Sequence, residues 1–314
     1  MKRLIIQRLI ALPPVIFVVT MITFSLVLLM PTDPTDIIMG EEVNPALLER
    51  VTRELGLDKP IPVQYINWIS DVFTGDLRHS IRTHLPVTTE LKNRIPVTLE
   101  LGILGLALSL IVAIPVGIIS ASRPNSAIDS AATLFAMWGV AMPNFFLGIL
   151  LIYLFAVILG WLPAIAYVPF SEDPWLNLKG MILPVIAFST THTAVLMRQT
   201  RSAMLEVLRQ DYVRTAHAKG FTERKVMTRH ALKNALTPLI TVAGLEVGQL
   251  LAGSVIIETV FGLPGVGRLA VTGVITSDFP VVQGVLLFAG AWVILANLLA
   301  DITYGLVDPR VRSG

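Results

Sequence analysis

The sequence predicts an all-α integral membrane protein with six transmembrane helices and a small helical segment outside the membrane after the first span. Composition supports this, because 54% of the 314 residues are hydrophobic and 15% are charged, whereas soluble domains carry about 25% charged residues. Charge-free apolar runs of about 20 residues, the length that crosses a bilayer core, also recur along the chain. The formal net charge of +2 gives no overall field that would favour a nucleic-acid partner.

Six apolar runs account for the predicted spans. The first follows a basic N-terminus and is longer than the roughly 7–15 residues of a signal-peptide core, so we expect it to remain as a span. The third opens an uncharged stretch, residues 130–171, that is too long for one helix, so we expect a span to about Leu159 and then a loop. We expect the fourth to continue as a helix to about Arg209. The predicted spans are Leu9–Met30, Leu101–Ser122, Ser130–Leu159, Gly180–Met197, Thr237–Ile257 and Phe279–Ala300.

Basic residues indicate the orientation, because Lys and Arg gather on cytosolic loops. They concentrate at the N-terminus, between Arg198 and Lys233, and in the C-terminal tail, three regions that six spans place on one side. We therefore expect an inner or plasma membrane protein with both termini in the cytosol. The expected parts are a cytosolic N-terminus with the first span (1–30), an external helical segment (31–97), five further spans (98–306) and a cytosolic tail (307–314).

Two short helices are predicted in the external segment. Asn44 is a suitable N-cap, with Pro45 at the first helical position. A second apolar stripe at helical spacing ends near Gly75, a residue type that commonly stops helices. The members of this stripe are Tyr65, Ile66, Ile69 and Phe73.

The sequence carries no motif for chemistry of its own. It has no Gly-Lys dipeptide and therefore no Walker A phosphate loop. It has no cysteine, which excludes disulfides and thiolate metal sites, and its five histidines lack the spacing of metal ligands. We therefore expect no catalytic residue, no metal and no cofactor in this chain. A partner protein or an ion gradient must then supply the energy for any transport.

One segment, residues 206–236, is dense in positive charge and is called the basic loop below. It contains the stretch DYVRTAHAKGFTERKVMTRHALKN. Asp211 is a good N-cap and Gly220 a good stop for a first helix, and Thr222 can cap a second one. This pattern indicates a structured loop on which another protein docks, although a loop whose charges only set the topology remains the alternative. A hydrophobic staple around the second cap is predicted from Phe221 and Val226.

The basic loop resembles the EAA loop of bacterial ABC-importer permease subunits, in which a short helix docks in a groove of an ATP-binding subunit. The glycine that is most characteristic of that loop corresponds to Gly220. The EAA triad falls on residues 214–216, where only Ala216 matches, and the usual Leu-Pro is replaced near residues 230–232. Both departures resemble the dipeptide/oligopeptide/nickel branch of the family. The resemblance implies an ATPase-coupling role for Asp211, Tyr212, Arg214, Ala216, Lys219, Gly220, Phe221 and Thr222.

The resemblance covers nearly the whole chain and is greatest to the first of the two permeases in such systems. The further stretches that carry it are GLDKPIPVQYINW, GDLRHS, ETVFGLPGVGRL, SDFPVVQG and DPRVR. It implies the type I ABC importer permease fold and an ATP-driven, binding-protein-dependent importer of di- or oligopeptides. The implied partners are a second homologous permease, two ATP-binding subunits that hold ATP and magnesium, and an external substrate-binding protein.

Two alternatives remain open. The same scaffold also suits an importer of nickel, glutathione or a sugar. A protein of a different class would be an ion-coupled secondary transporter or an assembly scaffold. The substrate itself is not readable from this chain, because in such systems the binding protein normally selects it.

Glu246 is an acidic residue within the fifth predicted span, where a carboxylate costs a few kcal/mol and should face a polar interior. Gln249 and Gly253 follow at helical spacing on the same face. These three residues are expected either to line a translocation path or, for Glu246, to make a polar contact with another helix. Gly253 also belongs to a set of small residues, with Gly244 and Gly248, that favours close helix packing.

Overall fold

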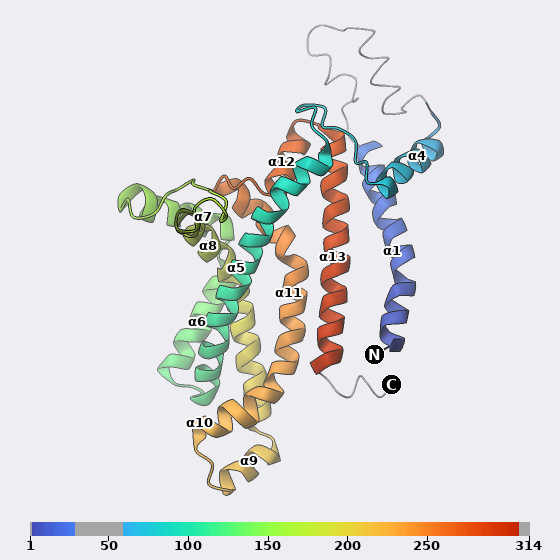
Figure 1. Cartoon of the computed structure of the whole chain (residues 1–314). Helices are drawn as coiled ribbons and strands as arrows, with labels where there is room; N and C mark the ends of the chain where they lie inside the picture. Colours follow the sequence, from blue (N-terminus) through green and yellow to red (C-terminus); the bar gives the residue numbers. More distant parts are fainter. Residues whose placement is uncertain (1, 29–58, 308–314) are drawn as a thin grey trace. The chain divides into compact units, whose positions relative to one another are not determined.

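The computed structural model describes residues 2–28 and 59–307, which are mainly helical (Figure 1). An isolated bridge between His79 and Pro86 is the only strand-like pairing in these two ranges. The predicted all-α class is therefore confirmed. The helix predicted at Asn44 lies outside the described residues.

The chain divides into two compact units. The first unit holds Thr98–Leu263 together with the chain from Leu295 onward, and the second holds the chain from Arg3 to Val97 with Pro264–Ile294. Helices α5 and α13 contribute to both units. The main helices are α1 (Lys2–Leu28), α4 (Ile61–Thr74), α5 (Val87–Ser122), α6 (Ala127–Ala141), α7 (Asn144–Leu151), α8 (Pro174–Leu208), α11 (Leu232–Val260), α12 (Val266–Ile275) and α13 (Phe279–Val307).

Four helices of the described part are long and apolar enough to cross a membrane, and a bent pair makes a fifth if it is counted as one span. These correspond to predicted spans two to six. The apolar part of α1 that is described, Leu12–Leu26, is shorter than a span. The first span and the count of six therefore stay predictions. The four helices are Val87–Ser122, Pro174–Leu208, Val226–Val260 and Phe279–Ala300.

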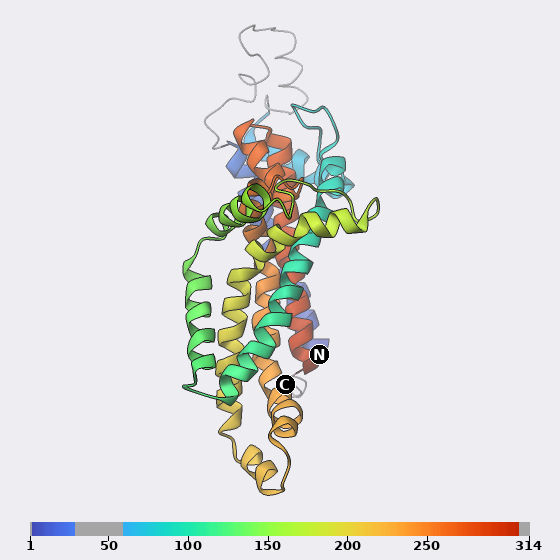
Figure 2. The same ribbon diagram turned by 90° about the vertical axis from the view of Figure 1, so that its left-hand side faces the viewer.

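The stretch predicted as the third span contains a sharp bend. Helix α6 ends at Ala141, and the following pair, α7 and the π-helical segment η1 (Ile152–Ile158), turns away from it by 101° (Figure 2). Pro143 explains the break, because proline lacks an N–H for the helix and forces the residue before it into an extended conformation. Met142 has that conformation, with ψ 122°. The sequence did not predict this break, and a third span from Ser130 to about Leu159 stays a prediction.

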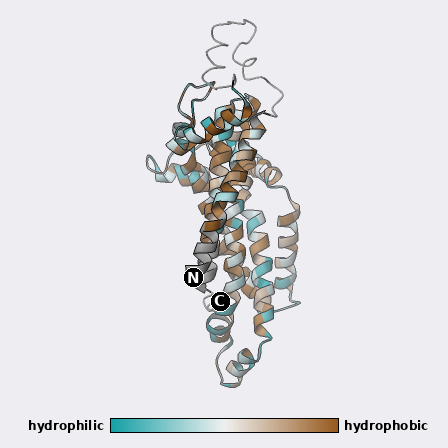
Figure 3. Cartoon of the chain, turned by 90° about the vertical axis from the view of Figure 1, so that its right-hand side faces the viewer, coloured by the Kyte–Doolittle hydropathy of each residue, from teal (hydrophilic) through white to brown (hydrophobic). Residues whose placement is uncertain are grey.

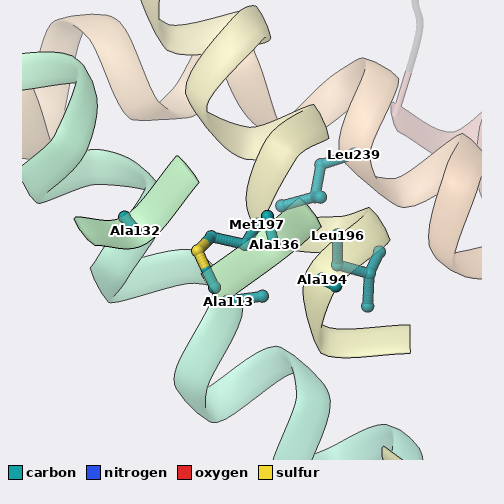
Figure 4. Close-up of a cluster of buried hydrophobic side chains, with 7 residues drawn as sticks. All are labelled: Ala113, Ala132, Ala136, Ala194, Leu196, Met197 and Leu239. Atoms are coloured by element: carbon teal, nitrogen blue, oxygen red, sulfur yellow. The ribbon is translucent and has the colours of Figure 1, made fainter. Parts of the chain in front are cut away.

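Small side chains form the core of the first unit, where α5, α6, α8 and α11 meet (Figure 4). Small residues allow helices to approach closely. A Cβ on Gly117 of α5 would lie 2.6 Å from the Thr200 Cβ of α8, and one on Gly139 of α6 would lie 3.0 Å from the Ala194 Cβ. This packing fixes α6 and α5 against α8. The buried residues of the cluster are Ala113, Ala132, Ala136, Ala194, Leu196, Met197 and Leu239.

Aromatic side chains join α1 to α4 in the second unit. Trp68 of α4 is only 3% exposed and packs on Phe24 of α1, and the Tyr65 hydroxyl lies 2.9 Å from the Thr20 hydroxyl. The predicted stripe ends at Gly75, which has φ 84°, as expected of a helix stop. Its other members do not all face inward, because Ile66 and Phe73 are largely exposed and Trp68 forms the buried contact instead.

A buried carboxylate fastens the segment after α4 to the start of α13 within the second unit. The Ser80 hydroxyl donates to Asp278 at 2.5 Å, and the backbone N–H of Ile81 donates to the same side chain at 3.2 Å. Asp278 is 4% exposed. Beneath this contact, Val87 and Leu91 of α5 pack with residues of α12 and α13. The stretches GDLRHS and SDFPVVQG, far apart in the sequence, therefore meet in space.

Candidate functional site

The first helix of the basic loop, α9 (Asp211–Ala218), ends as the sequence predicted. Gly220 has φ 79°, a backbone conformation that favours glycine. Its N–H donates to the His217 carbonyl at 2.9 Å, and the Phe221 N–H donates to the Ala216 carbonyl at 3.4 Å. These two bonds form a Schellman motif, which satisfies carbonyls at the helix end.

The predicted start of α9 was one residue too late. Gln210 is the N-cap, with extended dihedral angles, and Asp211 is the first helical residue. Helix boundaries depend on local geometry that residue type alone does not fix to a single position. Asp211 still favours the helix, because a carboxylate in the first turn opposes the positive end of the helix dipole.

The second helix of the loop is one turn long. Thr222 occupies its N-cap, as predicted, but contributes through its backbone carbonyl, which accepts from the N–H groups of Lys225 and Val226. The helix α10 (Glu223–Lys225) continues into a π-helical segment, η2 (Val226–Ala231), and then into α11. The predicted staple is confirmed, because Phe221 packs on the cluster that contains Val226.

The basic loop has its own apolar core. Val213 and Ala216 of α9 are buried with Val226, and Val207, Leu208 and Phe221 pack against them. The loop is also tied on its surface, where His217 contacts Glu223 at 3.0 Å and Lys225 lies 4.5 Å above the Phe221 ring. The loop is therefore a folded element. A loop whose charges only set the topology would not need a packed core.

Most of the predicted coupling residues are exposed. Figure 3 shows that the ribbon of this loop, at the lower end of the view, includes hydrophilic residues. Tyr212 is partly exposed and its hydroxyl accepts from the Asn234 side chain at 2.7 Å. Ala216 differs, because it is 5% exposed and belongs to the core of the loop. The exposed members are Asp211, Tyr212, Arg214, Lys219, Gly220 and Thr222.

Glu246 is buried between two helices of the first unit. Its carboxylate lies 2.5 Å from Nδ1 of His192, which projects from α8 and is itself 7% exposed. Gly253 is close to the same place, since a Cβ there would lie 3.2 Å from the Phe188 ring. Gln249 is exposed instead. The structure thus brings Glu246 and Gly253 together at α8 and leaves Gln249 apart.

Sequence reasoning missed the partners of the buried acids. His192 lies in the fourth predicted span and Glu246 in the fifth. Two ionisable residues within neighbouring spans were the signal from which this pair could have been predicted. Glu258, just beyond the predicted end of the fifth span, is fully buried and accepts a hydrogen bond of 2.7 Å from the Thr98 hydroxyl. In the described part of the chain, no group of three or more His, Asp or Glu side chains could hold a metal ion.

Comparison with known proteins identifies the family. The family model described as binding-protein-dependent transport system inner membrane component matches residues 113–313. A model for the N-terminal part of such membrane components matches residues 1–102. The chain belongs to this family. It is therefore an inner membrane component of an ABC importer, in which ATP hydrolysis and substrate capture are tasks of partner proteins.

Full-length relatives of this inner membrane component are named as peptide permeases. A peptide transport system permease protein of Brucella abortus (strain 2308) is 42% identical over 312 residues, which cover 99% of both chains. The dipeptide transport system permease protein DppB of Escherichia coli (strain K12) is 39% identical over 336 residues, again covering 99% of both chains.

A solved structure shares the fold of this inner membrane component. The MetNI methionine ABC transporter, in an inward-facing conformation, has a chain that matches with a TM-score of 0.57. The match covers 69% of this chain and 96% of that one, at 19% sequence identity. At this identity the match supports the fold alone, which is that of an ABC importer membrane subunit.

Proposed function

We propose that this inner membrane component forms the peptide-conducting path of an ATP-driven importer together with a second, homologous permease. The observation that carries the proposal is the alignment over 98–99% of both chains with permeases named for peptide or dipeptide transport. An ion-coupled secondary transporter is set aside, because the family is a binding-protein-dependent one. Two ATP-binding subunits and an external binding protein complete the proposed complex.

The basic loop is the proposed docking site for one ATP-binding subunit. Its internal core and Schellman turn support this assignment, since they hold α9 in a fixed orientation on the end of α8 and on η2. The exposed residues Tyr212, Arg214 and Lys219 would contact the subunit directly, with Asp211, Gly220 and Thr222 beside them. Ala216 and Phe221 would act from beneath, by keeping α9 in place.

Six spans are the proposed topology, with α1 as the first and the bent pair α6–α7 as the third. An even number of spans then leaves the basic loop and both termini on the cytosolic side, and residues 31–97 outside. The proposed parts are those expected from the sequence: 1–30, 31–97, the core 98–306 with the loop 206–236, and the tail 307–314.

Single cysteines test this topology, because the chain has none of its own. Asp76 and Arg229 are both exposed. We expect Asp76→Cys to react with a membrane-impermeant maleimide in intact spheroplasts, and Arg229→Cys to react only after permeabilisation. Ala113→Cys, at a fully buried position, serves as the negative control. Labelling of Arg229→Cys in intact spheroplasts would rule out the proposed side of the basic loop.

Reconstitution tests the function. The chain is co-expressed with the neighbouring permease, ATPase and binding-protein genes, purified and inserted into liposomes. We expect the ATPase subunits to co-purify, and radiolabelled alanyl-alanine to accumulate only with ATP on the ATPase side and binding protein on the other. Unlabelled peptides should compete, whereas nickel, glutathione and sugars should not. Competition by one of those three without competition by peptides would assign that substrate instead.

A further inference from the structure

A buried carboxylate at the start of α6 is bonded from three directions within the first unit. Asp129 is 4% exposed. Arg201 of α8 donates from Nε to Oδ1 at 2.6 Å and from Nη2 to Oδ2 at 2.8 Å. The Ser120 hydroxyl of α5 donates to Oδ1 at 2.5 Å, and the Asn125 backbone N–H donates to Oδ2 at 2.8 Å.

The geometry of this pair makes it a strong and directional connection. Two parallel N–H···O bonds between a guanidinium and a carboxylate fix both distance and orientation, and they are charge-assisted. Because the carboxylate is buried, loss of the arginine would leave a charge without its partner, which is strongly unfavourable. Arg201 and Asp129 should therefore move together.

The arginine stands on the part of α8 that carries the basic loop. Leu208, the last residue of α8, lies two turns beyond Arg201, and α9 begins three residues later. Val207 and Leu208 pack on the buried core of α9. They also pack on a second cluster, which joins α5, α8 and the η2–α11 segment and contains Ala121, Ala203, Met204, Met227, Ala231 and Ala235.

Helix α6, in contrast, contributes no residue to either of these two clusters. It touches α8 through small residues, Ala132, Ala136 and Gly139, while Leu134 and Met137 are more than 60% exposed. Small side chains permit close contact between the two helices. The Asp129–Arg201 pair joins the start of α6 to α8 through charge-assisted bonds, and the Thr191 hydroxyl of α8 donates to the Gly139 carbonyl near the end of α6 at 3.2 Å.

We infer that the Asp129–Arg201 pair transmits the movement of the basic loop to α6. When an ATP-binding subunit displaces α9, the end of α8 follows through Val207 and Leu208, and the ion pair makes α6 follow α8. The break at Pro143 then allows α6 to pivot relative to α7. This inference rests on the proposed function, because it takes the basic loop as the element that the ATPase moves.

Assembled complexes in liposomes test the inference, with alanyl-alanine as the transported probe. Two variants, Asp129→Asn and Arg201→Gln, break the pair. A third, Arg201→Lys, keeps the positive charge but loses the two parallel N–H donors of the guanidinium. Arg198→Gln is the matched control, since Arg198 is an exposed arginine one turn earlier on α8. Three quantities are measured: retention of the ATPase subunits, ATP hydrolysed, and peptide imported per ATP.

We expect Asp129→Asn and Arg201→Gln to retain the ATPase subunits and to import about tenfold less peptide per ATP. Arg201→Lys should recover part of this ratio, and Arg198→Gln should stay within about twofold of the unmodified complex. An unchanged ratio in both pair-breaking variants would overturn the inference. So would a loss of import that only follows a loss of assembled complex, because that would be a structural effect.

The proposed function fails in a different and recognisable way. If the proposed function is wrong, the unmodified chain itself will not retain ATPase subunits or import peptide in an ATP-dependent manner. If only the inference is wrong, the unmodified complex works, and the pair-breaking variants either work equally well or lose import only together with the assembled complex. Ser120→Ala offers a milder change, since it removes one bond to Asp129 and leaves the ion pair in place.

Discussion

Gly220→Val is expected to abolish transport while the protein still inserts into the membrane. The residue has φ 79°, and a β-branched side chain in this left-handed region costs about 1–2 kcal/mol. A Cβ at this position would meet no atom of this chain within 4 Å. The strain therefore falls on the turn itself, and it should displace α9 and the face offered to the ATP-binding subunit.

Gly75→Val is the matched control for this prediction. Gly75 also ends a helix, has φ 84°, and would also have nothing within 4 Å of an added Cβ. The backbone strain should be similar, but the residue lies in the external segment of the proposed topology. Peptide uptake, ATPase co-purification and ATP hydrolysis stimulated by the binding protein are compared in the two variants. Full stimulation in Gly220→Val would show that the basic loop does not couple hydrolysis to transport.

The second large effect is expected at Glu246, as a loss of stability. Glu246→Leu would leave His192 buried without its partner, and an unsatisfied buried polar group costs about 1–3 kcal/mol. We therefore expect a lower thermal unfolding temperature of the purified complex, with lost uptake as its consequence. A residue that only lined the path would instead impair uptake at unchanged stability.

A double-mutant cycle separates these two roles of Glu246. His192→Leu and Glu246→Leu, singly and together, should show a coupling energy of about 1–3 kcal/mol, because removing both partners removes the unsatisfied group. Gln249→Leu is the control on the same helix, and its exposed position predicts a small change in stability. Additive losses in the cycle would contradict an interhelical role for the pair.

The parts of this fold that the sequence predicted are those that depend on nearby residues. Apolar runs located α8, α11 and α13, and Gly220 marked the end of α9, because length, hydropathy and a positive φ are local properties. The bend at Pro143 was missed inside an uncharged stretch, where composition alone suggested a continuous span. Pro143 was the residue that could have predicted the bend, because proline marks turns and helix boundaries.

The candidate site was less readable than the fold, because its polar contacts join distant residues. Glu246 was recognised as unusual, but only the packing of α8 on α11 reveals His192 as its partner. Asp129 was left outside the predicted spans, since the third span was predicted to begin at Ser130. The structure shows that it is buried and bonded to Arg201. Such pairs depend on how helices are rotated about their axes, and no single-sequence pattern specifies that rotation.

The π-helical segment η2 sets the angular phase between the basic loop and α11. A π-helical turn corresponds to one extra residue in an α-helix, and each α-helical residue advances the chain by about 100°. Loss of one residue between Val226 and Ala231 would restore regular α-helix and leave the angle of α9 about the axis of α11 nearly unchanged. Loss of one residue from α11 itself would instead turn α9 by about 100°, so that residues that now face outward from the loop would face its neighbours. The segment η2 can therefore absorb a change of one residue in length that α11 cannot.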